Sequence, residues 1–224
     1  MLRTRVMPCL LLQNSKLVKT VKFKNPDYVG DPINAIMIYN EKEVDELIFL
    51  DVTATVDAKS PPFKLISEIA TECFMPFTYG GGLRSLDDAK KIFKLGVEKI
   101  AVNSYAVENP EFITKLAEIH GSQSVVSSID VKKTWGGYKV FTKGGTKNTG
   151  MDPLEWAKEV ENRGAGEILL TSIDRDGVMG GYDLELISRV SKVVRVPVIA
   201  CGGAGKIEHF RDAVDAGALS LIHI

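Results

Sequence analysis

One carboxylate closes an apolar run, a position from which a side chain can carry out acid/base chemistry. Asp130 ends the run Val125–Ile129. Burial beside such a run can shift the pKa of a carboxyl group, so that the group exchanges protons with a bound substrate. We therefore predict that Asp130 is the catalytic acid/base. The alternative is a structural aspartate that holds the following loop or pairs with a lysine such as Lys19.

Other polar residues at the ends of apolar runs are weaker candidates. Asp51 follows one run, and Asp174 and Asp176 follow another, but acids at such positions also often cap the next turn. Lys19 and Asn103 are predicted to orient a substrate or neutralise its charge. The alternative for both is a solvated side chain.

Glycine-rich turns after several apolar runs predict a phosphate ligand. Their bare amides can approach an oxyanion closely, although glycines also serve ordinary turns. Two of these turns are related by an internal repeat, which favours a substrate with a phosphate at each end. The predicted substrate-binding and phosphate-binding residues are Lys19, Asp51, Gly81, Gly82, Asn103, Ser104, Asp176, Gly177, Gly202 and Gly203.

The elements that must position these residues alternate along the chain. Strands apolar on both faces indicate a parallel sheet covered by helices. We predict strands at 5–12, 46–52, 75–79, 98–103, 124–130, 166–172 and 196–201, and helices at 31–43, 62–73, 85–95, 109–119, 152–163, 184–193 and 206–216.

The two halves of the chain repeat each other at about 120 residues, half the length of a typical barrel. Residues 46–50 match 167–171, and the turn at 80–82 matches 201–203. This repeat favours a closed α/β (β/α)₈ TIM barrel over an open doubly wound sheet. Within the repeat, Leu11 is the counterpart of Asp130.

Local signals place helix starts and one hairpin. Asp31-Pro32, Asn109-Pro110 and Asp152-Pro153 each put a capping side chain before a proline in the first turn. Segment 132–150 is predicted to be a hairpin or flexible flap that turns at 135–138. Trp135, at this turn, either stacks on a base or covers apolar surface.

Composition excludes several classes of protein. The 224 residues are 45% apolar and 25% charged with a net charge of −1, and no basic run predicts binding to nucleic acid or to an anionic membrane. No N-terminal hydrophobic segment resembles a signal peptide and none reaches spanning length, so we expect a soluble, cytoplasmic protein. Cys9, Cys73 and Cys201 lack the paired spacing of a disulfide framework or a zinc site. We predict no metal and no cofactor.

The carboxyl end departs from the barrel pattern. The eighth strand should begin near Ala218, and the chain ends at Ile224, too soon for that strand and its helix. The last six residues, LSLIHI, also match one translated frame of a transposase sequencing adaptor. We therefore expect residues 1–218 to form a single, incomplete barrel and residues 219–224 to be a non-native tail, with no role for His223.

Several longer motifs occur along the chain: RVMPCL at 5–10, FLDVTA at 49–54, GGG at 80–82, GSQ at 121–123, ID at 129–130 and RGAGEILLTSIDRDG at 163–177. With these motifs, the chain resembles the cyclase subunit of imidazole glycerol phosphate synthase from residue 1 to about 218. The resemblance implies a barrel that takes ammonia from a separate glutaminase subunit and adds it to a nucleotide with two phosphates. The products would be imidazole glycerol phosphate and an aminoimidazole carboxamide ribotide, for histidine and purine synthesis.

The resemblance also implies an ammonia gate. Arg5, Glu46, Lys99 and Glu167 match four charged residues that ring the amino-terminal mouth of the family's barrel. The glutaminase would dock on that face, with Asp45 and Glu98 among its contacts. A purely structural ring of ion pairs is the alternative.

The family pattern fails at one catalytic position. The family uses two aspartates, at the ends of strands one and five. Asp130 matches the second, and Leu11 stands at the first. Losing an acid/base group typically costs about 10² to 10⁴ in rate, so we expect poor orthodox cyclase activity. Residues 10–12 and 18–23 resemble instead a paralogous branch associated with sugar amidation in surface-polysaccharide pathways.

We therefore predict an ammonia-accepting lyase of this branch that acts on a bis-phosphorylated or nucleotide-sugar-type substrate. Three alternatives remain open at this point. One is the orthodox histidine cyclase. The second is a phosphosugar isomerase, for which the four charged residues would have no purpose. The third is a non-catalytic barrel that only activates a glutaminase or conducts its ammonia.

Overall fold

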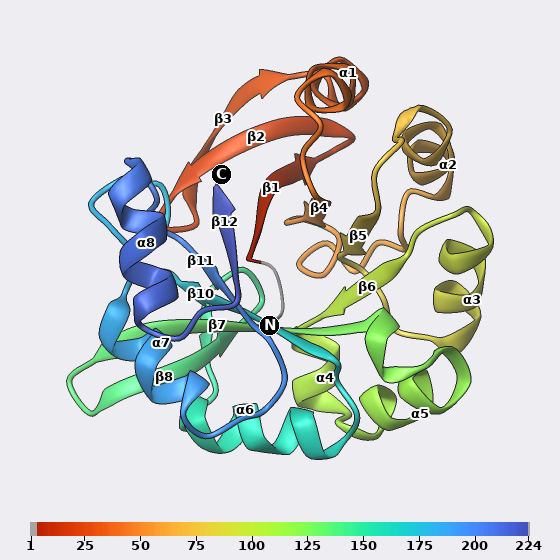
Figure 1. Cartoon of the computed structure of the whole chain (residues 1–224). Helices are drawn as coiled ribbons and strands as arrows, with labels where there is room; N and C mark the ends of the chain where they lie inside the picture. The colour runs from red at the N-terminus through yellow and green to blue at the C-terminus, as the bar shows by residue number, and fades with distance from the viewer. Residues whose placement is uncertain (1–3, 224) are drawn as a thin grey trace.

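A computed structural model describes residues 4–223, which form a closed barrel of parallel strands surrounded by helices (Figure 1). The helices follow one another around the outside of the barrel in chain order. The fold is therefore the (β/α)₈ TIM barrel that the alternating pattern predicts. No helix within residues 4–223 is long and apolar enough to cross a lipid bilayer.

All seven predicted strands and all seven predicted helices are present, with small shifts at their ends. The barrel strands are β1 (Arg5–Gln13), β4 (Leu47–Asp51), β5 (Phe77–Gly80), β6 (Lys99–Val102), β7 (Val125–Thr134), β10 (Glu167–Ser172), β11 (Val198–Cys201) and β12 (Ser220–His223). The helices are α1 (Pro32–Glu41), α2 (Phe63–Glu72), α3 (Leu86–Lys94), α4 (Ser104–Glu108), α5 (Glu111–His120), the 3₁₀ turn η1 (Ser122–Ser124), α6 (Pro153–Asn162), α7 (Leu184–Ser191) and α8 (Ile207–Asp215).

The eighth strand is formed, contrary to the expectation that the chain stops too soon for it. β12 pairs in parallel with β1, where Met7 is opposite Ile222, and with β11, where Ile199 is opposite Ser220. The edges of β1 and β11 are therefore covered and the barrel is closed. Strand formation needs only apolar residues that fit the two neighbouring edges. The expected non-native origin of residues 219–224 stays a prediction.

Alternation along the strands separates two apolar cores. Met7, Cys9 and Leu11 occupy every second position of β1 and belong to a cluster inside the barrel. A second, larger cluster, which includes Leu12 and Ile36, packs the strands against the surrounding helices. Because successive strand residues point to opposite faces, a single-residue shift of β1 would exchange the two sets.

Capping residues start two helices as predicted. The Asp31 carboxylate accepts backbone hydrogen bonds from Ile33 and Asn34 ahead of α1, and Asp152 caps α6 in the same way. The prediction for Asn109 is wrong. α5 begins one residue later, with Pro110 at its N-cap and no capping side chain.

Two antiparallel hairpins extend from the barrel at pseudo-symmetric positions. β1 continues into β2 (Lys16–Val21) and β3 (Lys24–Gly30), and β7 continues into β8 (Gly137–Thr142) and β9 (Lys147–Asn148). The second hairpin confirms the one predicted at 132–150. Trp135 lies at its tip and is fully exposed, so it covers no apolar surface. The first hairpin is absent from the sequence prediction.

Closure by β12 predicts a specific stability effect. Ile222 is buried inside the barrel, and its carbonyl accepts a hydrogen bond of 2.7 Å from the Tyr182 hydroxyl. Ile222→Ala should lower the free energy of unfolding by about 2 to 5 kcal/mol because it leaves a cavity. The free energies come from urea unfolding curves. Leu219→Ala, at a side chain that is 37% exposed, is the matched control. Equal, small losses for both variants would mean that β12 does not close the barrel.

Candidate active site

A cavity of about 320 Å³ lies at the carboxyl ends of the barrel strands. Its volume is in the range of small-molecule sites, and its position is where TIM barrels bind their substrates. Among the predicted site residues, the lining includes Asp51, Gly81, Asn103, Ser104, Asp130 and Asp176. Lys19 lies on β2 with an exposed side chain and does not line this cavity.

Asp130 lies at the carboxyl end of β7 and is buried in the wall of the cavity. The Asn103 side-chain amide donates a hydrogen bond of 2.7 Å to its carboxylate, and no ion pair with Lys19 occurs in the part of the chain described. Burial raises the pKa of Asp130 to about 7. The nearby Asp176 raises it further, while Asn103 and Thr171 oppose the rise through hydrogen bonds. A carboxyl group with this pKa can donate or accept a proton near neutrality.

Leu11 lines the same cavity from β1, the counterpart of β7 in the first half-barrel. Its side chain is 5% exposed and belongs to the apolar cluster inside the barrel. It can neither exchange a proton nor accept a hydrogen bond. The carboxyl end of the barrel thus has an acid/base group on the β7 side and a hydrocarbon wall on the β1 side.

Asp176 is fully buried and holds the first hairpin against the barrel. Its Oδ2 accepts hydrogen bonds from the Thr20 hydroxyl at 3.0 Å and the Phe23 amide at 3.4 Å, and its backbone carbonyl accepts one from the Lys22 amide. Within the described residues, its Oδ1 has no partner. Burial raises the pKa of Asp176, so the carboxyl group keeps a proton to higher pH than an exposed aspartate.

Asp51 and Asp174 are engaged in local hydrogen bonds. Oδ1 of Asp51 accepts from the amide and hydroxyl of Thr53 and from the Ala54 amide, at 2.9 to 3.0 Å. Asp174 accepts from the Lys133 amide and lies outside the cavity lining. Asp51 therefore has the geometry of an acid that caps the next turn, which was the alternative to a substrate-binding role.

Asn103 and Ser104 connect the end of β6 to the second hairpin. Oδ1 of Asn103 is buried and has no partner among the described residues, which leaves an acceptor beside Asp130. The Ser104 hydroxyl accepts a hydrogen bond of 2.9 Å from the Lys143 amide.

The glycine turns have a structural cause that repeats in both halves of the barrel. A Cβ on Gly81, at φ +125°, would lie 2.6 Å from the Asp51 carbonyl oxygen. A Cβ on Gly202, at φ +89°, would lie 2.8 Å from the Ser172 carbonyl oxygen. Each turn passes so close to the end of the preceding strand that only glycine fits. The phosphate role of these turns stays a prediction.

The second predicted phosphate region encloses little space in this conformation. Gly177, Gly202 and Gly203 line a hollow of about 20 Å³ next to Asp176, enough for roughly one water molecule. Gly82 is not among the residues that line either space; its φ is +70° and it packs against the Lys59 carbonyl.

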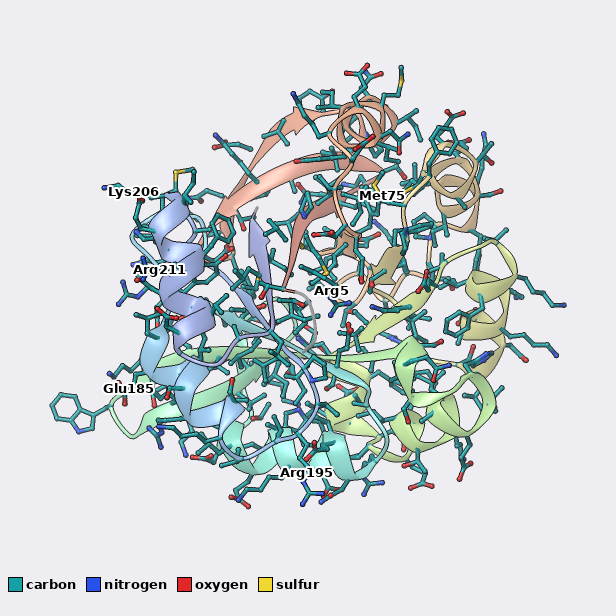
Figure 2. The ribbon with its side chains drawn as sticks, in the orientation of Figure 1. Arg5, Met75, Glu185, Arg195, Lys206 and Arg211 are labelled. Atoms are coloured by element: carbon teal, nitrogen blue, oxygen red, sulfur yellow. The ribbon has the colours of Figure 1, made fainter. Side chains whose placement is uncertain are left out.

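A ring of four charges occupies the opposite, amino-terminal end of the barrel. Arg5 pairs with Glu46 and with Glu167, the latter at 2.8 Å. Lys99 pairs with Glu46 at 3.0 Å and with Glu167 at 3.2 Å. Figure 2 shows Arg5 near the middle of the barrel, whereas Glu185 and Arg211 lie on the helices outside it, α7 and α8. The structure therefore brings together all four residues of the predicted gate, each acid between both bases.

Two acids lie next to this charge ring in sequence and are exposed. Asp45 accepts a hydrogen bond of 3.2 Å from the Val6 amide, and Glu98 precedes Lys99. Both side chains are accessible at the amino-terminal end, where the predicted glutaminase contact would lie. Their role in docking stays a prediction.

Sequence reasoning missed several residues of the cavity. Thr171 is opposite both Asp130 and Cys201 in the sheet register. The available signal was their place at the ends of the predicted strands 166–172 and 196–201. Thr20 and Lys143 reach the cavity from the two hairpins, and no local pattern in the sequence indicates that these hairpins fold over the barrel mouth.

The fold and the site together define a TIM barrel with a half-barrel repeat. It has a cavity with an acid/base group at one end and a charge ring at the other. A family model described as histidine biosynthesis protein matches residues 5–223. The chain belongs to this family, and within it to the proteins similar to the HisF cyclase subunit of imidazole glycerol phosphate synthase.

Similar proteins carry names of two kinds. The chain is 54% identical to "Putative imidazole glycerol phosphate synthase subunit hisF2" of Pseudomonas aeruginosa, over 100% of the chain and 92% of that protein. It is 50% identical to a hisF3 subunit of Vibrio vulnificus named in the same way, over 93% of the chain and 81% of that protein. It is 46% identical to the imidazole glycerol phosphate synthase subunit HisF of Natranaerobius thermophilus, over 98% and 88%.

The raised pKa of Asp130 predicts a pH dependence of stability. Since the folded chain binds this proton more tightly than the unfolded chain, stability should fall as pH rises from about 4 to about 7 and then level off. Asp130→Asn should be more stable than the wild type at pH 8, by at most roughly 4 kcal/mol, because each pKa unit is worth about 1.4 kcal/mol. Urea unfolding between pH 4 and 8 measures the slope.

The exposed Asp212 provides the control for this pH series. Asp212→Asn should keep the wild-type slope. In Asp130→Asn, the free energy of unfolding should still fall with pH, but less steeply, because the pKa of Asp176 is raised as well. An Asp130→Asn variant whose stability follows the wild-type curve at every pH would contradict the assignment.

Proposed function

We propose that this chain accepts ammonia from a glutaminase partner and uses it in a synthase reaction in the cavity at the carboxyl ends of its strands. The observation that supports this most directly is the charge ring, Arg5, Glu46, Lys99 and Glu167, which places alternating charges across the amino-terminal entrance. Burying four charges is costly unless they are paired. A structural purpose alone would be met more easily by apolar side chains.

The interior between the two ends supports transport of a neutral molecule. The side chains there are buried and mostly apolar: Met7, Ile48, Ala101, Val126, Leu169 and Ile199. Charged species pay a large desolvation penalty in such surroundings, whereas neutral ammonia does not. Ammonia that passes the ring would reach the cavity beside Asp130 without becoming ammonium.

The chemistry of the cavity supports a reaction with one acid/base group. Asp130 has a pKa of about 7, and Asn103 holds its carboxylate at 2.7 Å. Leu11 removes the second carboxylate that the orthodox cyclisation requires. We infer that the acceptor is an activated or phosphorylated sugar of a surface-polysaccharide pathway. The similarity to proteins named as putative imidazole glycerol phosphate synthase subunits hisF2 and hisF3 supports a synthase of the cyclase type.

A second candidate, a barrel that conducts ammonia without performing chemistry, is favoured by the same residue. Leu11 makes the β1 wall of the cavity inert, and a pure conduit would need no proton transfer. The two candidates differ in what they require of Asp130.

Replacement of Asp130 separates the enzyme from the conduit. The chain and its glutaminase are incubated with glutamine labelled with ¹⁵N at the amide and with a panel of nucleotide-activated sugars, and labelled products are measured by mass spectrometry. Asp130→Asn should lower product formation by about 10² to 10⁴ while glutamine hydrolysis continues. Glutamine hydrolysis without any labelled product, unchanged in Asp130→Asn, would identify a conduit. An Asn variant with full product formation would exclude Asp130 as the acid/base group. Absence of label in every product would contradict the proposed synthase reaction.

Leu11→Asp tests whether the missing carboxylate alone blocks the histidine reaction. The variant restores a carboxylate opposite Asp130, so turnover of the histidine-pathway nucleotide should rise by at least about tenfold over the wild type. Leu11→Asn, of similar shape but without an acid/base group, is the control and should show no gain. No gain for Leu11→Asp either, in a variant that folds by circular dichroism, would count against a surviving cyclase site. Brisk wild-type turnover would show that Leu11 is no obstacle.

A further inference from the structure

The side chains that line the cavity differ in charge, and one of them is a cation. Lys143 is the only lysine or arginine among the described residues that line it, against the three carboxylates of Asp51, Asp130 and Asp176. Asp51 is engaged in its own turn. Burial raises the pKa of Asp130 to about 7, so this carboxyl group carries only part of its negative charge near neutrality, and burial raises the pKa of Asp176 as well. An anionic ligand would therefore meet a cation with weak opposition from the acids.

Lys143 belongs to a short turn between β8 and β9, here called the lysine turn (Lys143–Thr146). Lys143, Gly144 and Gly145 have left-handed backbone angles, with φ of +53°, +63° and +74°. The Lys143 amide donates to the Ser104 hydroxyl at 2.9 Å, and the Thr146 hydroxyl donates to the Lys143 carbonyl at 2.6 Å. These bonds fix the turn beside Asn103 at the end of β6.

The lysine turn packs across the mouth of the cavity. A Cβ on Gly145 would lie 3.0 Å from the Phe23 ring and 3.1 Å from the Ile173 side chain, so the turn touches the tip of the first hairpin. Lys143, Gly144 and Thr146 line the cavity together with Gly81 on the first half-barrel. The turn thus contributes a wall of the site.

The ammonium group of Lys143 is only loosely held. Its Nζ lies 3.8 Å from Oε1 of Glu108, and the two side chains are 46% and 51% exposed. Exposed ion pairs of this kind contribute little to stability. The ammonium can therefore exchange Glu108 for an oxygen of a ligand without a large loss.

We propose that Lys143 binds a phosphoryl group of the acceptor in the cavity between the lysine turn and the Gly81 turn, and so selects phosphorylated substrates. This inference rests on the proposed function, since it concerns the substrate of the same site. A lysine ammonium binds phosphate as a compact point charge. The group belongs either to a sugar phosphate or to a nucleoside diphosphate, which share this chemistry.

Binding measurements with charge-removing variants test the proposal. Isothermal titration calorimetry at low ionic strength and pH 6.5, below the pKa of Asp130 of about 7, uses ribose 5-phosphate, UDP and inorganic phosphate as probes. Lys143→Met keeps the aliphatic stem and should weaken binding about tenfold, the usual loss for a charge-assisted hydrogen bond. Lys143→Arg should retain most of the affinity. Lys147→Met removes the same charge from β9, outside the cavity lining, and should change the affinity less than about twofold.

Glu108→Gln gives a reciprocal test that a structural role would not produce. Removing the competing carboxylate should tighten phosphate binding a few-fold, and only while Lys143 is present. The probe that binds more tightly, ribose 5-phosphate or UDP, identifies the source of the phosphoryl group. The affinity of the wild type should fall with added salt more steeply than that of Lys143→Met.

Three results would overturn the proposal: no binding of any probe by the wild type, unchanged affinity in Lys143→Met, or equal losses in Lys143→Met and Lys147→Met. The measurement requires neither a glutaminase nor ammonia. Failure here would leave the labelling result for ammonia transfer intact. Lys143-dependent binding without any ¹⁵N transfer would overturn only the proposed function.

Discussion

The pairing of β12 with β1 and β11 closes the sheet, and closure determines which side chains meet inside the barrel. In a closed barrel, alternate residues of each strand face a shared interior. Residues from strands far apart in sequence are thereby brought to the same level. The charge ring at one end and the cavity at the other both depend on this constraint, since neither is built from neighbouring residues.

The interior changes along the barrel axis from a ring of charges, through apolar layers, to a cavity that contains a few polar groups. The ring charges offset their own desolvation by pairing, each acid with both bases. The middle layers, such as Met7 and Leu169, exclude water and ions. Polar groups reappear where the strands end, around Asp130 and Asn103. A small neutral molecule is the species best suited to travel from one end to the other.

Leu11 alters the electrostatics of the cavity as well as its chemistry. A second carboxylate on β1 would raise the pKa of Asp130 further through repulsion between like charges. With Leu11 in place, burial is the largest cause of the shift and Asp176 contributes the repulsion that remains. The acid/base group therefore titrates near neutrality while the opposite wall presents hydrocarbon to the substrate. Lys143, on the second hairpin, then supplies the positive charge of the lining.

The amino-acid sequence by itself determined the strand and helix order, the twofold repeat and the position of Asp130 at a strand end, because these follow from local periodicity and short turns. It also identified the four residues of the ring through resemblance. Only the tertiary structure decided which groups touch. Asn103 holds Asp130 in place of Lys19, and Asp176 is buried under the first hairpin. The last residues form β12 because a short apolar run can fill an open sheet edge, a contact that depends on partners distant in the chain.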